Sequence, residues 1–484
     1  MWIGRLGYIV GWLLLFLAAA HLPPFLMALA DPDPQVAGAF VLSAGAAAFV
    51  GGALILSFRV ARARRDRRVL FLIPLAGWGG LPLFACLPFL ITGHMTSLLD
   101  AYFEATSALT TTGATLLPLL DPVPPSLILW RAVLSWLGGL GTVVAAVALF
   151  QVLNVGGLQL IQNRLPHGEG GGVMERMRGA AVPLLQVYVF ISLLCGLMLW
   201  ATGLEPFDAL VLALSTPSTG GFVPRDGALA AYATPLAQGV LIAFMALGAI
   251  NMTYHWSLLR GRPPGYWRDT EVRYFAALVA MGTLFLWVGG VVDQPGGSLA
   301  DGLGSSLFVA VSALSTTGIT PSPTADGVLL YPLVVLSLVF IGGATASTAG
   351  GLRLLRMIVL LRHANSELHR LAHPHSVSRI NVNGKPAQTG DLRAIWLYGS
   401  GVLVVLTVGA LVLTALEVPF RTATATALAA LATAGPAAMV IDPTFGGYWT
   451  LDAVSLAVLC PLMVIGRIEV AILLAVFWRA FWRS

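Results

Sequence analysis

The chain has 484 residues, of which 57% are hydrophobic and only 10% are charged, and its formal net charge is +5. A soluble domain carries about 25% charged residues, so this composition excludes a soluble globular protein and indicates an integral membrane protein. Apolar runs of about 20 residues recur along the whole chain, which favours membrane-spanning helices over the short strands of a transmembrane barrel. The three cysteines lie far apart in apolar segments, so they predict neither a disulfide framework nor a metal site.

Two spans precede the repeated part of the chain, and we assign residues 1–68 to them. The first apolar run, residues 3–30, is broken by Pro23 and Pro24, and we favour a retained helix over a cleaved signal peptide because its basic N-terminal region is weak. The second run, residues 36–58, ends in a cluster of arginines. A cluster beside a span predicts the cytoplasmic side and contact with anionic membrane lipid rather than with nucleic acid. The arginines are Arg59, Arg62, Arg64, Arg65, Arg67 and Arg68.

One pattern then repeats four times: an outgoing span, a helix too short to cross the membrane, a polar loop, a returning span and a basic loop. The four units are predicted at residues 69–178, 179–270, 271–390 and 391–484. The outgoing spans are predicted at 69–91, 181–204, 274–292 and 395–416, and the returning spans at 127–153, 236–259, 331–361 and 451–481. The short helices are predicted at 100–109, 205–215, 301–314 and 421–431.

Charged residues support a topology of ten spans with both termini in the cytoplasm. Nearly all arginines fall in loops predicted inside; Arg225 and Arg421 fall in loops predicted outside, and Arg131 lies near the boundary of a span. Acidic residues gather in the loops predicted outside, where they are expected to attract cations. These acids are Asp31, Asp33, Asp100, Glu104, Asp121, Glu205, Asp208, Asp293, Asp301, Asp326, Glu417, Asp442 and Asp452.

The four polar loops share one form: Thr, a small residue, Gly and then an apolar residue. Their glycines recur at intervals of roughly a hundred residues, which suits a multi-helix membrane repeat. The four triads are Thr111, Thr112 and Gly113; Thr219, Gly220 and Gly221; Thr316, Thr317 and Gly318; and Thr433, Ala434 and Gly435.

Four such loops predict a cation filter if they meet around one axis. Backbone carbonyls can replace the water shell of a cation, and glycine lets the backbone approach the axis and tolerates positive φ. Each short helix directs its C-terminus, with its partial negative charge, toward the membrane centre. Gly and Thr are also common packing residues in membrane helices, but that alternative explains one loop better than four loops in register.

Two further features interrupt spans in the second half of the chain. Ten small residues fall in the middle of the third returning span, where each Gly destabilises a regular helix by roughly 1 kcal/mol. They indicate either a helix-packing face or a non-helical segment lining a cavity. The ten residues are Gly342, Gly343, Ala344, Thr345, Ala346, Ser347, Thr348, Ala349, Gly350 and Gly351.

The last span carries Arg467 and Glu469. Charge inside a membrane costs at least about 2.5 kcal/mol, so such residues usually face a cavity or pair internally. The two could pair with each other, but helical residues two apart face each other poorly. Arg467 could instead extend toward the inner membrane surface.

These motifs and the architecture resemble the Trk/Ktr/HKT superfamily of potassium transporters, most closely its TrkH-type bacterial subunits, over essentially the whole chain. The resemblance implies an all-α integral membrane fold, with four pseudo-repeated helix–pore loop–helix units around one central pore and two N-terminal helices. It implies uptake of K⁺ as the transported ion across the bacterial cytoplasmic (inner) membrane, with no organic cofactor. It also implies a homodimer and a separate cytoplasmic nucleotide-binding regulatory subunit (TrkA-like).

The resemblance also gives roles to particular residues. The twelve triad residues would form the K⁺ filter, residues 342–351 would be an intramembrane gate below it, and Arg467 would lie beside that gate. In the plant branch of the superfamily, Ser at the first filter glycine accompanies Na⁺ preference, so Gly113 favours K⁺. Each loop has one such Gly, so we expect only moderate selectivity. Pro436 departs from the pattern, because it stiffens the fourth loop.

Other sites and functions are less well supported. Glu367, His369, His373 and His375 match no metal-ligand spacing, so we interpret residues 362–393 as a cytoplasmic interaction loop. No nucleotide-binding motif or catalytic constellation is present, which argues against an enzyme. A Na⁺-permeable or cation-coupled secondary transporter is the main alternative, although midplane acids and inverted repeats are scarce.

Overall fold

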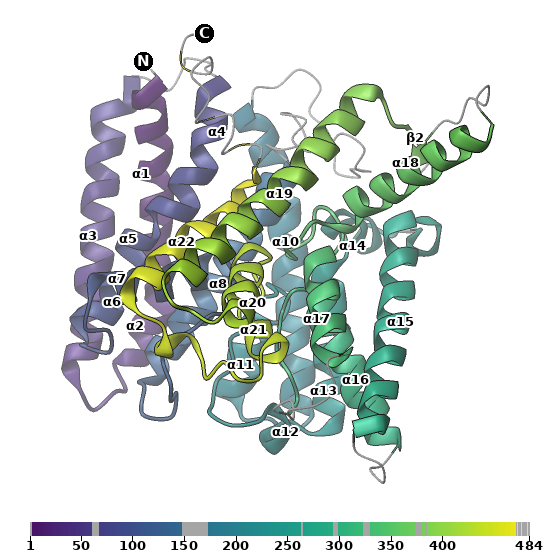
Figure 1. Ribbon diagram of the computed structural model, residues 1–484. Helices are drawn as coiled ribbons and strands as arrows, with labels where there is room; N and C mark the ends of the chain where they lie inside the picture. Colours follow the sequence, from purple (N-terminus) through teal and green to yellow (C-terminus); the bar gives the residue numbers. More distant parts are fainter. Residues whose placement is uncertain are drawn as a thin grey trace.

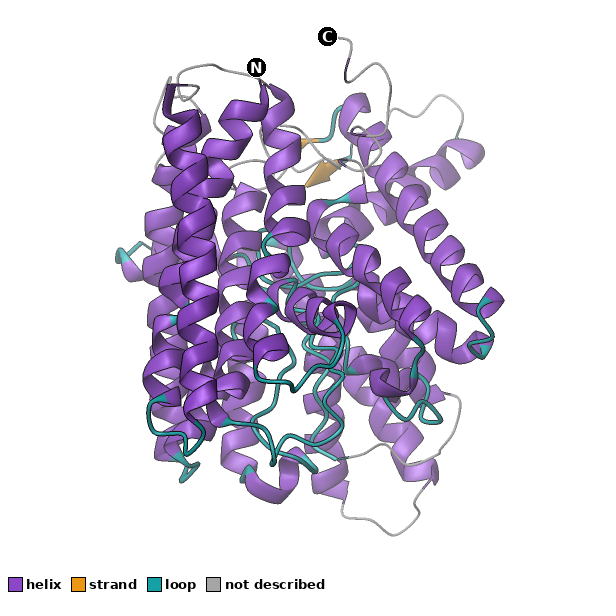
Figure 2. Cartoon of the chain, turned by 90° about the vertical axis from the view of Figure 1, so that its left-hand side faces the viewer, coloured by secondary structure: helices purple, strands orange, loops and turns teal. Residues whose placement is uncertain are grey.

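The computed structural model describes residues 2–60, 67–147, 173–262, 265–293, 299–322, 330–373, 380–382, 385–470, 472, 476 and 482. They form a bundle of long helices whose irregular segments run into the middle of the molecule (Figures 1 and 2). Seven described helices are long and apolar enough to cross a membrane, and one bent pair makes an eighth if it counts as a single span. The predicted all-α membrane fold is therefore confirmed. The described residues add one short antiparallel pair of two-residue strands, β1 (Asn381–Val382) and β2 (Lys385–Pro386).

The N-terminal part consists of α1 (Trp2–Ala20), α2 (Leu22–Ala28) and α3 (Pro34–Phe58). α1 and α3 lie side by side at the edge of the bundle (Figure 1). The two helices can pack closely because Gly11 has no side chain: a Cβ atom there would lie only 2.8 Å from the carbonyl oxygen of Gly51. Asp33 caps α3 by accepting a hydrogen bond from the backbone N–H of Gln35 at 2.9 Å. The arginine cluster that follows lies partly outside the described residues, since residues 61–66 are not described.

The remaining helices follow the predicted order. Residues 67–147 contain α4 (Arg67–Leu75), a π-helical turn (Ala76–Gly80), α5 (Pro82–Ala85), α6 (Leu87–Ile91), α7 (Leu98–Leu109) and α8 (Pro125–Ala145). Residues 173–262 contain α10 (Val173–Ala201), α11 (Pro206–Ser215), α12 (Leu229–Tyr232), α13 (Pro235–Ala249) and α14 (Met252–Leu259). Residues 265–373 contain a 3₁₀ turn (Tyr266–Arg268), α15 (Thr270–Asp293), α16 (Leu299–Leu314), α17 (Leu330–Ile341) and α18 (Leu354–Ala372). The last part contains α19 (Thr389–Ala415), α20 (Phe420–Leu431), α21 (Ala437–Ile441), a 3₁₀ turn (Tyr448–Thr450) and α22 (Ala453–Ile468).

The second returning span differs from the prediction of one continuous helix over 236–259. It breaks between α13 and α14, whose axes differ by 103°. Ile250 takes an extended conformation, and the Asn251 side chain caps α14 by accepting from the N–H of Thr253 at 3.0 Å. Asn is a strong N-cap residue, so a new helix starts here although the apolar run continues.

The third returning span is also interrupted. α17 has 12 residues and ends at Ile341, and α18 begins only at Leu354. The segment between them is non-helical, with left-handed backbone at Gly342, Ala346 and Gly351. Its glycines and hydroxyl residues therefore do not form a helix-packing face.

The two ends of the chain lie together. The aromatic rings of Trp2 and Trp482 are 5.3 Å apart. The basic loop over residues 162–178 and the C-terminal arginines, Arg479 and Arg483, lie largely or wholly outside the described residues.

Candidate functional site

The four short helices α7, α11, α16 and α20 end in the same hydrogen-bonded turn. In each, the N–H of the second triad residue donates to the carbonyl five residues earlier, which is the bond of a Schellman motif. The bonds are Thr112 to Ser107 (2.8 Å), Gly220 to Ser215 (2.8 Å), Thr317 to Ser312 (2.9 Å) and Ala434 to Ala429 (2.8 Å). The short helices therefore end at the residues predicted from the sequence. The four triads share the same turn through their second residue.

The first residue of every triad is a threonine with left-handed backbone. Thr111, Thr219, Thr316 and Thr433 have φ values of 52°, 54°, 61° and 54°. This conformation is rare for a β-branched residue and costs of order 1–3 kcal/mol at each position. Glycine would adopt it without strain.

Three of the four threonine hydroxyls make polar contacts from that position, and that of Thr433 has no hydrogen-bond partner among the residues that the structure describes. Thr316 Oγ1 accepts a hydrogen bond from the N–H of Gly350 at 2.8 Å. Thr111 Oγ1 accepts from the guanidinium of Arg467. Thr219 Oγ1 donates to the carbonyl of Ser218 at 2.7 Å. Two of the four hydroxyls thus connect the triads to the segment of residues 342–351 or to Arg467.

The glycines of the triads bring the four loops into one closed ring. A Cβ atom at Gly113 would overlap the carbonyl oxygen of Gly220, and one at Gly221 would overlap that of Thr317. A Cβ atom at Gly318 would lie 3.4 Å from the oxygen of Ala434, and one at Gly435 would lie 2.8 Å from that of Thr112.

Each glycine therefore faces the middle residue of the next triad, in the order first, second, third, fourth and back to first. All twelve predicted triad residues lie in this ring, and all are buried. The backbone comes this close only because no side chain stands between neighbouring loops. The ring thus brings the peptide backbones of all four loops close together.

The fourth glycine departs from the other three. Gly113, Gly221 and Gly318 have φ values of 78°, 72° and 80°, whereas Gly435 has no left-handed backbone. Proline restricts the residue before it to extended conformations, so Pro436 accounts for the difference. Gly435 therefore does not share the left-handed conformation of the other three glycines.

Residues 342–351 lie against the ring on the threonine side. Thr348 Oγ1 donates to the carbonyl of Pro217 at 2.9 Å, two residues before the second triad. A Cβ atom at Gly350 would overlap the carbonyl oxygen of Ala432, directly before the fourth triad. With the contact between Gly350 and Thr316, this segment touches three of the four loops.

Residues at the break between α13 and α14 form hydrogen bonds with the same segment. The N–H of Ala344 donates to the carbonyl of Ala249 at 2.8 Å, and the N–H of Met252 donates to the carbonyl of Ala346 at 3.1 Å. Glu271 on α15 accepts from both the N–H and the hydroxyl of Thr345, each at 2.9 Å. The backbone groups freed by the two interrupted spans therefore satisfy each other.

Arg467 is fully buried between the ring and this segment. Its Nε donates to the carbonyl of Thr110 at 2.6 Å, and its Nη1 donates to the carbonyl of Thr348 at 2.6 Å. The side chain does not extend toward the membrane surface, so that alternative is wrong.

Glu469 does not pair with Arg467. Its carboxylate accepts from Arg356 at 2.6 Å and lies 3.9 Å from Arg353, both on the α18 side of the interrupted span. The Arg356 guanidinium also lies 3.7 Å from the centre of the Tyr398 ring. The C-terminal end of α22 is therefore attached both to the middle and to the end of the segment that interrupts the third returning span.

Several acids predicted to face the outer solution are instead buried behind the loops. Glu104 is fully buried and pairs with Arg131 at 3.2 Å, and it also accepts from the N–H of Leu116 at 2.9 Å. Asp442 is fully buried and accepts from Thr422 at 2.6 Å. Sequence reasoning missed the Glu104–Arg131 pair, although two opposite charges in consecutive helices of one unit were a usable signal.

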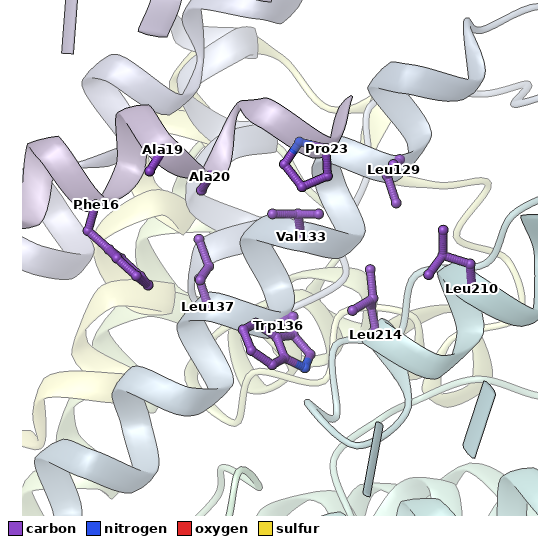
Figure 3. A pocket seen from close by; sticks show the side chains of 10 residues that line it. All are labelled: Phe16, Ala19, Ala20, Pro23, Leu129, Val133, Trp136, Leu137, Leu210 and Leu214. Carbon is purple, nitrogen blue, oxygen red and sulfur yellow. The ribbon is translucent and has the colours of Figure 1, made fainter. Parts of the chain in front are cut away.

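The cavities near the N-terminal helices offer no cation ligands. One, of about 420 Å³, is lined by apolar side chains of α1, α2, α8 and α11, among them Phe16, Val133 and Leu214 (Figure 3). Its lack of oxygen ligands makes it unsuitable for K⁺. No group of three or more His, Cys, Asp or Glu suited to a metal ion occurs among the described residues. His369 and His373 stack at 4.8 Å, and His375 lies outside the described residues.

Comparison with known proteins gives consistent matches along the whole chain. Residues 83–481 match the family model TrkH, described as cation transport protein. The chain is 34% identical to the Trk system potassium uptake protein TrkH of Salmonella typhimurium and 33% identical to that of Escherichia coli K12, over 98% of each chain. Its fold is similar to the crystal structure of the potassium transporter TrkH from Vibrio parahaemolyticus, with a TM-score of 0.91, 31% identity and full coverage of both chains.

Proposed function

This chain belongs to the TrkH family of cation transport proteins, is a Trk-type potassium uptake transporter rather than an enzyme, and on that premise we propose that K⁺ crosses it through the ring of four triads. The observation that carries the proposal is the closed contact between successive loops, in which each glycine faces the carbonyl of the next triad. Carbonyl oxygens from four loops replace the water shell of the ion as it enters.

The short helices assist the ion electrostatically. α7, α11, α16 and α20 all end at the ring, so the partial negative charge of four helix C-termini is directed at its centre. The four units, residues 69–178, 179–270, 271–390 and 391–484, contribute one helix and one loop each. A cation in the ring is stabilised without any carboxylate in its path, which agrees with the burial of Glu104 and Asp442 behind the loops.

Residues 342–351 act as a gate on the threonine side of the ring. Contacts of the segment with three loops support this role, because K⁺ leaving the ring on that side meets the segment first. Arg467 holds the closed arrangement by donating to Thr348. Its positive charge next to the ring also opposes the passage of K⁺ while the gate is closed.

The proposal extends to partners and location. The chain functions in the bacterial inner membrane, with both termini in the cytoplasm, as a homodimer with a nucleotide-binding regulatory subunit. The name of the relatives, Trk system potassium uptake protein, supports a multi-component assembly. α18 supports a cytoplasmic contact, because it projects from the bundle (Figure 1) and exposes Leu368 and Leu371. This helix connects directly to the gate.

Uptake of Rb⁺ in a bacterium that lacks its own potassium uptake systems tests the filter. Gly113→Ser and Gly318→Ser place a side chain where the next loop lies, so both should weaken the preference for Rb⁺ over Na⁺. Gly45→Ser is the matched control, because Gly45 has no atom within 4 Å of a built Cβ. Unchanged preference in both filter variants, with normal membrane expression, would overturn the proposal in favour of a Na⁺-permeable or cation-coupled transporter.

A further inference from the structure

The fourth loop places an apolar side chain among the glycines of the other three. A Cβ atom at Gly113 or at Gly318 would lie 3.2 Å from Cδ of Pro436, and one at Gly221 would lie 3.0 Å from its Cγ. One proline ring therefore contacts three loops that come from three different units. A side chain can do this only if it lies inside the ring of loops and not behind its own loop.

The equivalent residues of the other three loops are more deeply buried than Pro436. Ala114, Phe222 and Ile319 are buried, with 1%, 2% and 6% of their surface exposed. Pro436 is partly exposed. Because the opposite side of the ring is covered by residues 342–351, Pro436 lies on the face that opens to the outer solution.

The sequence explains why the fourth loop differs. In the first two loops a serine of the short helix holds the residue after the glycine: Ser107 Oγ donates to the carbonyl of Ala114 at 2.6 Å, and Ser215 Oγ accepts from the N–H of Phe222 at 2.8 Å. The fourth helix has Ala429 at this position, and Pro436 has no N–H. The fourth loop therefore lacks the serine bond that holds the first two loops, and Pro436 cannot donate a bond like that of Phe222. Ser312 of the third loop has no hydrogen-bond partner among the described residues either, so the proline is what sets the fourth loop apart.

The carbonyl of Gly435 is also engaged elsewhere. It accepts a hydrogen bond from the hydroxyl of Tyr448 at 3.0 Å, and the N–H of Gly435 donates to the carbonyl of Thr112 at 2.5 Å. Tyr448 is buried and packs against Phe103 and Phe445. The first three triad glycines therefore share a left-handed backbone conformation. Gly435 does not, and both its N–H and its carbonyl are hydrogen-bonded to other residues.

We propose that Pro436 is a rate- and specificity-determining residue of this transporter, an inference that rests on the proposed function of the ring. Its CH₂ groups narrow the outer face of the ring and offer a cation no ligand. Its restriction of Gly435 removes one of four equivalent carbonyls from the ion. An ion that enters loses part of its water shell without gaining the full set of protein oxygens, which slows K⁺ and weakens its discrimination from Na⁺.

Pro436→Ala tests this inference, because Ala adopts the observed φ of −61° and ψ of −24° without strain. The maximal rate of Rb⁺ uptake should rise by roughly threefold or more, and inhibition by Na⁺ should weaken, because the opening widens and Gly435 is released. Pro443→Ala, in the same outer loop beyond α21, is the matched control and should change neither quantity.

Tyr448→Phe separates the two effects. It leaves the proline ring in place but releases the carbonyl of Gly435, so Na⁺ inhibition should weaken while the maximal rate stays within about twofold of the parent. If Pro436→Ala changes neither rate nor Na⁺ inhibition while Gly113→Ser alters ion preference, the inference is wrong and the filter remains. If Gly113→Ser and Gly318→Ser also change nothing, the proposed function itself fails.

Discussion

Arg467 donates a hydrogen bond of 2.6 Å to the carbonyl oxygen of Thr348, 119 residues away in the chain. The same guanidinium donates to the carbonyl of Thr110 at 2.6 Å, at the end of the first short helix. One buried side chain therefore joins the segment of residues 342–351 to the first loop of the ring.

Replacing Arg467 with Met should raise basal Rb⁺ uptake. The substitution removes a buried cation and its bonds to Thr110 and Thr348, and hydrogen bonds to a charged group contribute about 1.5–3 kcal/mol each. A shift of that size toward the open gate is roughly tenfold or more in population. Uptake in cells, normalised to membrane expression, measures the effect, and a decrease at normal expression would show that Arg467 supports conduction instead.

Glu271→Ala should also increase uptake, because it removes the acceptor that holds Thr345 of the gate. Glu271→Gln is the matched control, since its amide oxygen still accepts from the N–H and the hydroxyl of Thr345. We expect the Ala variant to exceed both the parent and the Gln variant in initial rate of Rb⁺ uptake. Equal rates for the Ala and Gln variants would mean that this contact does not hold the gate.

Glu104→Ala should destabilise the protein strongly. The substitution leaves Arg131 buried without its partner, and breaking a buried ion pair in this way costs about 3–5 kcal/mol. Glu205→Ala is the comparison, because Glu205 is largely exposed and its pairing with Arg225 belongs to a class that contributes at most about 1 kcal/mol. Thermal unfolding in detergent should show a much lower melting temperature for Glu104→Ala, and equal losses for the two variants would contradict the structural role of the buried pair.

Gly138→Ala should abolish uptake, whereas Gly141→Ala on the same helix should not. A Cβ atom at Gly138 would overlap the carbonyl oxygen of Leu109, where the first short helix ends, while the nearest neighbour of a Cβ at Gly141 is 3.8 Å away. The first substitution must displace the first loop of the ring. Normal Rb⁺ uptake by Gly138→Ala would show that the loop tolerates displacement.

The sequence predicted the four short helices accurately because their ends are determined locally. Each helix ends at the predicted residue, since the threonine that follows is the left-handed residue of a Schellman motif and the glycine lies two positions further. The interruption at residues 342–351 was detectable for a similar reason, because glycines and hydroxyl residues are poor helix formers.

Other features depend on tertiary contacts that composition does not report. The break at Ile250 and Asn251 lies in an apolar run without proline, and its backbone groups are satisfied by residues 344 and 346, about a hundred positions away. The sequence does not distinguish the buried acids Glu104 and Asp442 from exposed acids, because burial depends on which helices pack against them. The position of Pro436 among the other three loops depends on how four distant segments pack, which the sequence around it does not report.

Anomalous diffraction from crystals of the protein grown or soaked in Rb⁺ tests the central claim most directly. We predict an anomalous peak inside the ring, within coordination distance of carbonyl oxygens of at least the first three triads, at Rb⁺ concentrations that saturate uptake. Rb⁺ peaks confined to other parts of the molecule, with none in the ring at those concentrations, would contradict the account.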